Sequence, residues 1–171
     1  MSVQYTPNGN VISILIPVFE SYLNRCKKRE SILIILKALA SITELQREAL
    51  YKTIFTSQTI VNRMLELMDS GNFIEHKYVA GRVIFGILHS NNIEYAEELV
   101  HRGLFNIILQ HVRSCQEQNR KLVDLIMLKI ISNIVASSFE AIQTLMGHPV
   151  FGEFVLCCTH PHSNHTKVSV R

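Results

Sequence analysis

Three cationic residues of the chain each precede a small or polar residue by four positions. The pairs are Lys37/Ser41, Arg82/Gly86 and Lys129/Asn133. Residues four apart share one face of a helix, and a lysine in an apolar helix must reach water or an anion because burying it unpaired is costly. A row of such pairs would suit an extended acidic segment. Asn133 could hydrogen-bond the backbone of that segment, and Gly86 could let it approach closely.

The same cations also have a simpler interpretation. They can be ordinary solvated side chains, or they can pair inside the protein with the nearby acids Glu30, Glu44 or Asp124. The register of the first pair, Lys37/Ser41, could also slip by one residue against the other two. Both alternatives stay open at the level of sequence.

A second group of chemically capable residues lies near the end of the chain, in CCTHPHSNH, with Cys157, Cys158, His160, His162 and His165. Cysteine and histidine are zinc ligands, but this spacing fits no common zinc finger. We expect a polar loop after two buried thiols and no metal site. The sequence also lacks a glycine-rich phosphate loop, HExxH and GxSxG, so we expect no enzyme and no cofactor.

Composition narrows the class of protein. Apolar residues make up 47% and charged residues 18% of the 171, which excludes a disordered chain and allows one ordinary domain. The net charge is only +3, so nucleic acid is not an expected partner. Apolar runs are too short to span a membrane, and the start resembles no signal peptide. We therefore expect reduced cysteines and a cytoplasmic or nuclear location.

Apolar residues recur at helical spacing along most of the chain, with glycine, proline and polar turns between the apolar segments. We expect residues 1–10 to be a disordered tail and 11–171 to form one all-α domain. The expected helices are 11–25, 31–43, 45–56, 59–69, 74–89, 93–101, 104–115, 120–136, 139–147, 149–158 and one that starts near 165.

The helical pattern repeats. When 86–112 is set above 133–158, Phe105 falls on Phe151, a shift of 46 residues (105 to 151). A looser third copy, 41–67, places Val61 under Phe105 and Met64-Leu65 under Ile108-Leu109, a shift of 44 (61 to 105). Periods near these values are typical of armadillo and HEAT arrays, so an α-solenoid is favoured over a closed helical bundle.

Residues 132–155, SNIVASSFEAIQTLMGHPVFGEFV, resemble the armadillo repeat family, at the join between the third helix of one repeat and the first two helices of the next. His148-Pro149 stands where the family usually has Ala-Gly, whereas Arg102-Gly103 keeps the glycine. The resemblance implies a right-handed superhelix of three to four partly complete repeats. Their approximate ranges are 11–43 (partial), 44–90, 91–136 and 137–171 (partial).

In that family the third helices, here 31–43, 74–89 and 120–136, line a groove for an extended peptide. The resemblance therefore implies a non-enzymatic module that binds an extended, acidic protein segment through Lys37, Ser41, Arg82, Gly86, Lys129 and Asn133. Import adaptors of the importin-alpha type use tryptophans in this groove. This chain has no Trp, so that function is less expected. The alternative is a structural subunit that self-associates, or packs on further repeats, through its terminal helices.

Overall fold

A computed structural model describes residues 9–45, 48–69, 73–90, 92–114 and 120–159 of the chain, and every regular element within these ranges is an α-helix. The helices are α1 (Gly9–Arg25), α2 (Arg29–Glu44), α3 (Glu48–Thr56), α4 (Gln58–Asp69), α5 (Ile74–Leu88), α6 (Ile93–His101), α7 (Leu104–Ser114), α8 (Arg120–Ser137), α9 (Phe139–Met146) and α10 (Phe151–Thr159). The all-helical prediction is confirmed. None of these helices combines the length and apolar character needed to cross a membrane.

The helix boundaries follow the sequence closely, with a few differences. Helix α1 begins at Gly9, so the last two residues of the predicted disordered tail are helical. The helix continues through Pro17, whose ring nitrogen lacks the hydrogen that a helix interior uses. We predicted that the tenth helix starts at Pro149, but α10 begins two residues later, at Phe151. The helix predicted near residue 165 lies outside the described residues.

Short polar side chains fix several helix starts. The Asn92 Oδ1 atom accepts a hydrogen bond from the Glu94 backbone N–H at 2.9 Å, and the Ser138 hydroxyl accepts one from the Ala141 N–H at 3.2 Å. Gly103, which follows the end of α6, has a φ of 87°, a left-handed conformation that glycine adopts readily at a helix end. These caps let consecutive helices reverse direction over very few residues.

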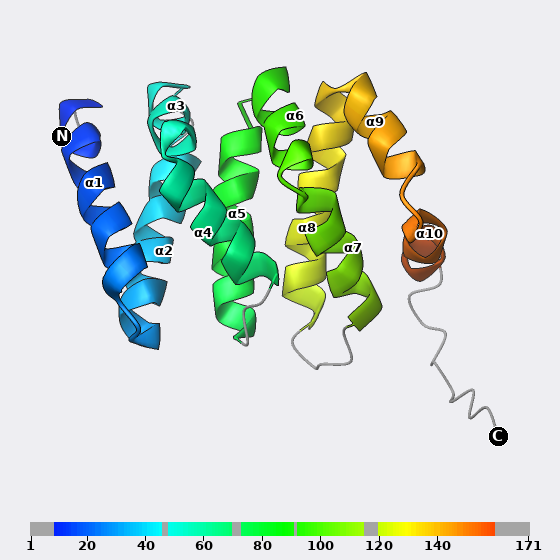
Figure 1. Ribbon diagram of the computed structural model, residues 1–171, viewed down its shortest axis with the longest axis horizontal. Coiled ribbons are helices and arrows are strands. Elements are labelled where there is room, and N and C mark those ends of the chain that lie inside the picture. Colours follow the sequence, from blue (N-terminus) through cyan, green and yellow to red (C-terminus); the bar gives the residue numbers. More distant parts are fainter. Residues whose placement is uncertain (1–8, 46–47, 70–72, 91, 115–119, 160–171) are drawn as a thin grey trace, which may run out of the picture.

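The helices follow one another along the long axis of the molecule, with α1 and α10 at opposite ends (Figure 1). Helix α5 lies between α2 and α8 and packs extensively against both. In front of these three in the view, α4 contacts α1 on one side and α7 on the other, and α7 contacts α10. Helix α6 contacts α9. From α1 to α7, each helix therefore contacts the helix three places later in the chain. The pair α3 and α6 meets through Phe55 and Tyr95, whose ring centres are 4.2 Å apart.

Helices α2, α5 and α8, which we call the third helices, bury the same pattern of positions. Shifting α2 by 44 residues (32 to 76) and α5 by 47 (76 to 123) superposes these positions. The pattern is Ile32, Ile35, Leu36, Leu39, Ala40 and Thr43 in α2; His76, Val79, Ala80, Val83, Ile84 and Ile87 in α5; Val123, Ile126, Met127, Ile130, Ile131 and Ile134 in α8. Because buried positions fix how a helix is rotated, this pattern sets which residues are equivalent.

Helices α4 and α7, each of which directly precedes a third helix in the chain, also bury equivalent positions. A shift of 44 residues (60 to 104) places the buried Ile60, Val61, Met64 and Leu65 on the buried Leu104, Phe105, Ile108 and Leu109. This is the register that the sequence comparison gives for Val61 and Phe105. In α10, reached by a shift of 46 residues (108 to 154), only one of the four positions is buried: Phe154 is buried, Val150 and Phe151 are partly buried, and Val155 is exposed.

Candidate functional site

The burial register makes two of the three predicted cations equivalent and moves the third. Arg82 of α5 corresponds to Lys129 of α8 by the shift of 47, but the shift of 44 pairs Arg82 with Ala38 of α2 (38 to 82). Lys37 corresponds instead to Gly81 and Leu128. One residue along a helix is a rotation of about 100°, so Lys37 points away from the row that contains Arg82 and Lys129. The interpretation of three copies of one feature is corrected to two.

A stripe of α5 that the core leaves uncovered passes through Arg82. It consists of Tyr78, Arg82 and Phe85, together with His89 directly after the helix; the four lie on one face and are all at least partly exposed. The equivalent positions of the neighbouring third helices are exposed or partly exposed as well: Ile34, Ala38 and Ser41 in α2, with Leu45 directly after it; Leu125, Lys129, Ser132 and Ala136 in α8. We call these positions the third-helix face.

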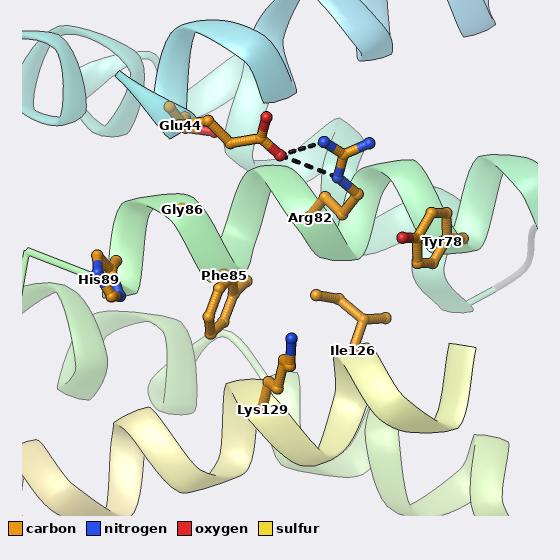
Figure 2. Close-up of a pocket in the computed structure, with 9 residues that line it drawn as sticks. Glu44, Tyr78, Arg82, Phe85, Gly86, His89, Ile126 and Lys129 are labelled. Carbon is orange, nitrogen blue, oxygen red and sulfur yellow. Dashed lines mark hydrogen bonds and ion pairs between the residues drawn. The ribbon is translucent and has the colours of Figure 1, made fainter. Parts of the chain in front are cut away.

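A recess of about 210 Å³ opens on this face, and we call it the Arg82 recess. Helix α5 contributes its stripe and Gly86, α2 contributes Thr43 and Glu44, and α8 contributes Ile126 and Lys129. Three of the six predicted binding residues, Arg82, Gly86 and Lys129, therefore line one recess (Figure 2). Its volume is that of roughly one or two side chains.

The Arg82 guanidinium is already partnered. It points toward the end of α2, where its Nε donates a hydrogen bond to Glu44 Oε1 at 3.1 Å and its Nη2 contacts the same oxygen (Figure 2). It also lies 5.9 Å from the centre of the Tyr78 ring. One of the internal acids considered from the sequence is therefore a real partner. A pair this exposed contributes little to stability, about 1 kcal/mol or less.

Lys129 is the more available cation. It is exposed, and its Nζ lies 5.7 Å from the centre of the Phe85 ring. Within the described parts of the chain it forms no ion pair. Asp124, the acid considered as its partner, lies 3.3 Å from His111 Nε2 instead. The ring of His89 lies beside that of Phe85, with 5.8 Å between their centres. Lys129, Phe85 and His89 therefore line the recess side by side.

Gly86 and Asn133 have structural surroundings that the sequence does not reveal. Gly86 is buried against α2, and a Cβ atom there would lie 2.4 Å from Thr43 Oγ1. The absence of a side chain at Gly86 therefore allows α2 to pack closely against α5. From the sequence we expected it to allow the close approach of a partner protein. The Nδ2 atom of Asn133 is buried and has no hydrogen-bond partner among the described residues. This amide must turn outward before it can donate to another chain.

Several residues of the recess were not identified from the sequence. Pairing each cation only with the residue four positions later does not identify Tyr78, Phe85 and His89. Their spacing along 74–89 was the available signal, since residues at i, i+4, i+7 and i+11 form one stripe. Glu44 was considered only as an internal partner.

The cysteine and histidine cluster of 157–165 lies outside the side chains that the structure describes. Among the described residues no group of three or more His, Cys, Asp or Glu is arranged to hold a metal ion. Cys26 is a free thiol. The candidate site is therefore a surface recess of cations and rings.

Comparison of the chain with protein-family models, curated proteins and solved structures gives no match.

Proposed function

We propose that the chain is an armadillo-type α-solenoid that binds an extended, acidic segment of a partner protein along the third-helix face. The row of α2, α5 and α8 supports the solenoid, because their buried positions repeat and α5 packs between its two equivalents. The observation that carries the binding function is the Arg82 recess, which joins two equivalent cations to exposed aromatic rings on this face.

The chemistry of the recess favours an acidic side chain flanked by apolar ones. A carboxylate beside Lys129 would gain a charge-assisted hydrogen bond without displacing an internal acid. A second carboxylate would compete with Glu44 for Arg82. Around the recess, Ile34 and Leu125 are exposed and offer apolar contact to the residues on either side. Lys37 lies outside the row and is a peripheral contact at most.

The test uses an array of immobilised twelve-residue peptides in which the number and spacing of Asp and Glu vary. Lys129→Glu is expected to weaken the best acidic binder at least tenfold, because an attraction becomes a repulsion. Lys52→Glu, on the exposed surface of α3, is the matched control and should leave binding unchanged. Equal loss from both variants would contradict the proposal, since it would reflect net charge alone.

Glu44→Gln gives the opposite sign in the same assay. Removing its charge releases the Arg82 guanidinium, so the affinity for a peptide with two acidic residues should rise, by about three- to tenfold. Arg82→Gln in the Glu44→Gln background should cancel this gain. An unchanged affinity in Glu44→Gln would exclude Arg82 as an anchor.

One observation favours the self-association alternative. Ile14, Val18 and Tyr22 are exposed at four-residue spacing on α1, and they form an apolar ridge at one end of the row. A second copy or a further repeat would cover such a ridge. Light scattering over a range of concentrations tests this function. If the mass stays that of a monomer and does not change in Val18→Glu, self-association through α1 is excluded.

A further inference from the structure

A second and larger cavity lies away from the third-helix face. It has a volume of about 610 Å³ and lies where the end of α1, the α1–α2 joint and α4 meet. None of its lining residues lines the Arg82 recess. The volume falls within the range of small-molecule sites, roughly 300 to 1,000 Å³. We call it the Arg63 cavity.

Two cations line the Arg63 cavity. Lys27 is exposed on the α1–α2 joint, and Arg63 projects from α4. The Nη1 atom of Arg63 donates to Glu66 Oε2 at 2.8 Å, but its Nε is buried without a hydrogen-bond partner in the described part of the chain. The Nε hydrogen is therefore unused within the described residues, and the side chain must shift before a ligand can accept from it.

The joint beside the cavity is strongly basic. Arg25, Lys28 and Arg29 are exposed within two residues of Lys27. Arg29 is engaged by Phe73, whose ring centre is 4.0 Å from its Cζ, and by Glu75 at 3.8 Å. Arg25 and Lys28 make no such ion pair among the described residues. This excess of cations exceeds what a single carboxylate requires and suits a phosphate group.

Glu66, which accepts the hydrogen bond from Arg63, also lines the cavity and brings one negative charge to it. The rest of the lining is neutral, with polar groups over an apolar floor. Asn24, Thr59 and Asn62 provide amide and hydroxyl groups, and the buried Leu23 and Ile32 form the floor. The Asn62 Oδ1 atom accepts a hydrogen bond from Arg102 Nη1 at 3.0 Å, which fixes the orientation of its amide. Such groups can hydrogen-bond the hydroxyls of a polyol.

We propose that the Arg63 cavity binds a phosphorylated polyol. The phosphate lies between Lys27 and Arg63, and the hydroxyls of the ring or chain contact Asn24, Thr59 and Asn62. The same chemistry occurs in a free inositol phosphate and in the head group of a phosphorylated inositol lipid. This site is independent of the peptide-binding function, because the two recesses share no residue.

Calorimetric titration of the full chain tests the proposal with inositol trisphosphate, inorganic phosphate and uncharged inositol. We expect binding of inositol trisphosphate at least tenfold tighter than that of inorganic phosphate, and none of inositol. Lys27→Gln and Arg63→Gln should each lower the affinity for inositol trisphosphate by about tenfold. Lys52→Gln is the control for lost charge and should have no effect.

Two further measurements separate binding in the cavity from adsorption to the basic joint. Asn24→Trp fills the mouth of the cavity without changing any charge, so it should abolish binding while the circular dichroism spectrum stays the same. Cys26 lines the cavity as a free thiol, and bound ligand should slow its alkylation, followed by mass spectrometry of the peptide that contains it. If Asn24→Trp binds as the parent chain does, or if the alkylation rate does not change at saturation, the proposal is overturned.

Vesicles distinguish the two sources of the ligand. If the chain sediments with vesicles that contain phosphorylated inositol lipid, and not with phosphatidylserine vesicles of equal charge, and if Lys27→Gln abolishes sedimentation, the ligand includes the lipid head group. Binding of soluble inositol trisphosphate without sedimentation supports a free metabolite. Failure of both probes overturns the proposal and leaves the peptide-binding test of the Arg82 recess unaffected.

Discussion

Tyr51 shows what a single buried polar atom does in this core. The side chain of Tyr51, in α3, is only 3% exposed, and its hydroxyl has no hydrogen-bond partner in the described part of the chain. Burial raises the pKa of the Tyr51 phenol above its ordinary value of 10.0, because the charged form loses its hydration. Burial of the ring stabilises the folded protein, whereas burial of the unpaired hydroxyl destabilises it.

Tyr51→Phe should therefore stabilise the protein by about 1 kcal/mol, measured as the free energy of unfolding in urea. The pH dependence gives an independent check. Since the folded pKa of Tyr51 exceeds the unfolded one, the unfolded chain loses this proton first, and stability falls as the pH rises above about 10. The variant should lose part of that slope. A destabilised Tyr51→Phe would show that the hydroxyl has a partner in solution.

At the scale of the helix, glycine determines how closely the third helices pack. A Cβ at Gly86 would lie 2.5 Å from the Cβ of Thr43, a residue only 1% exposed, whereas a Cβ at Gly81 would lie 3.1 Å from Ile126 Cγ2. Thr43 is further held by its hydrogen bond to the Ala40 carbonyl at 2.9 Å. The contact between α2 and α5 at Gly86 is therefore closer than the contact between α5 and α8 at Gly81.

Gly86→Ala should lower the free energy of unfolding by about 1–3 kcal/mol, because α2 must move to admit the methyl group. Gly81→Ala is the matched substitution on the same helix. Both variants gain about 1 kcal/mol of helix propensity, but the Cβ at position 81 needs only a small shift of the Ile126 side chain, so the net effect of Gly81→Ala should be much smaller. Urea unfolding of both variants measures the difference, and equal effects would argue against the close approach at Gly86.

Helix positions were predictable from the sequence because apolar spacing and turn residues are local signals. Which positions of the third helices are equivalent was harder to predict, since this depends on which side chains the neighbouring helices bury. Ala38 and Lys37 are neighbours in the chain, and only the core shows that Ala38 is equivalent to Arg82 and Lys129. The pairing of Arg82 with Glu44 joins two helices and leaves no trace in local spacing.

At the scale of the molecule, the row of helices predicts an elongated particle. A compact domain of 171 residues has a radius of gyration of about 16 Å. Small-angle scattering of a monomeric sample should give a larger value. A radius at or below that of a compact domain would contradict the open row and favour a closed bundle.

The central place of α5, packed on both flanks by its own equivalents, has a consequence for how the chain loosens. Helices at either end of the row have neighbours on one flank only, so they can fray without breaking the centre. Amide protons of α5 should then exchange with solvent last, and those of α1 and α10 first. The segment that presents Arg82, Phe85 and His89 thus belongs to the most persistent part of the molecule, and a ligand would meet a surface that is already set.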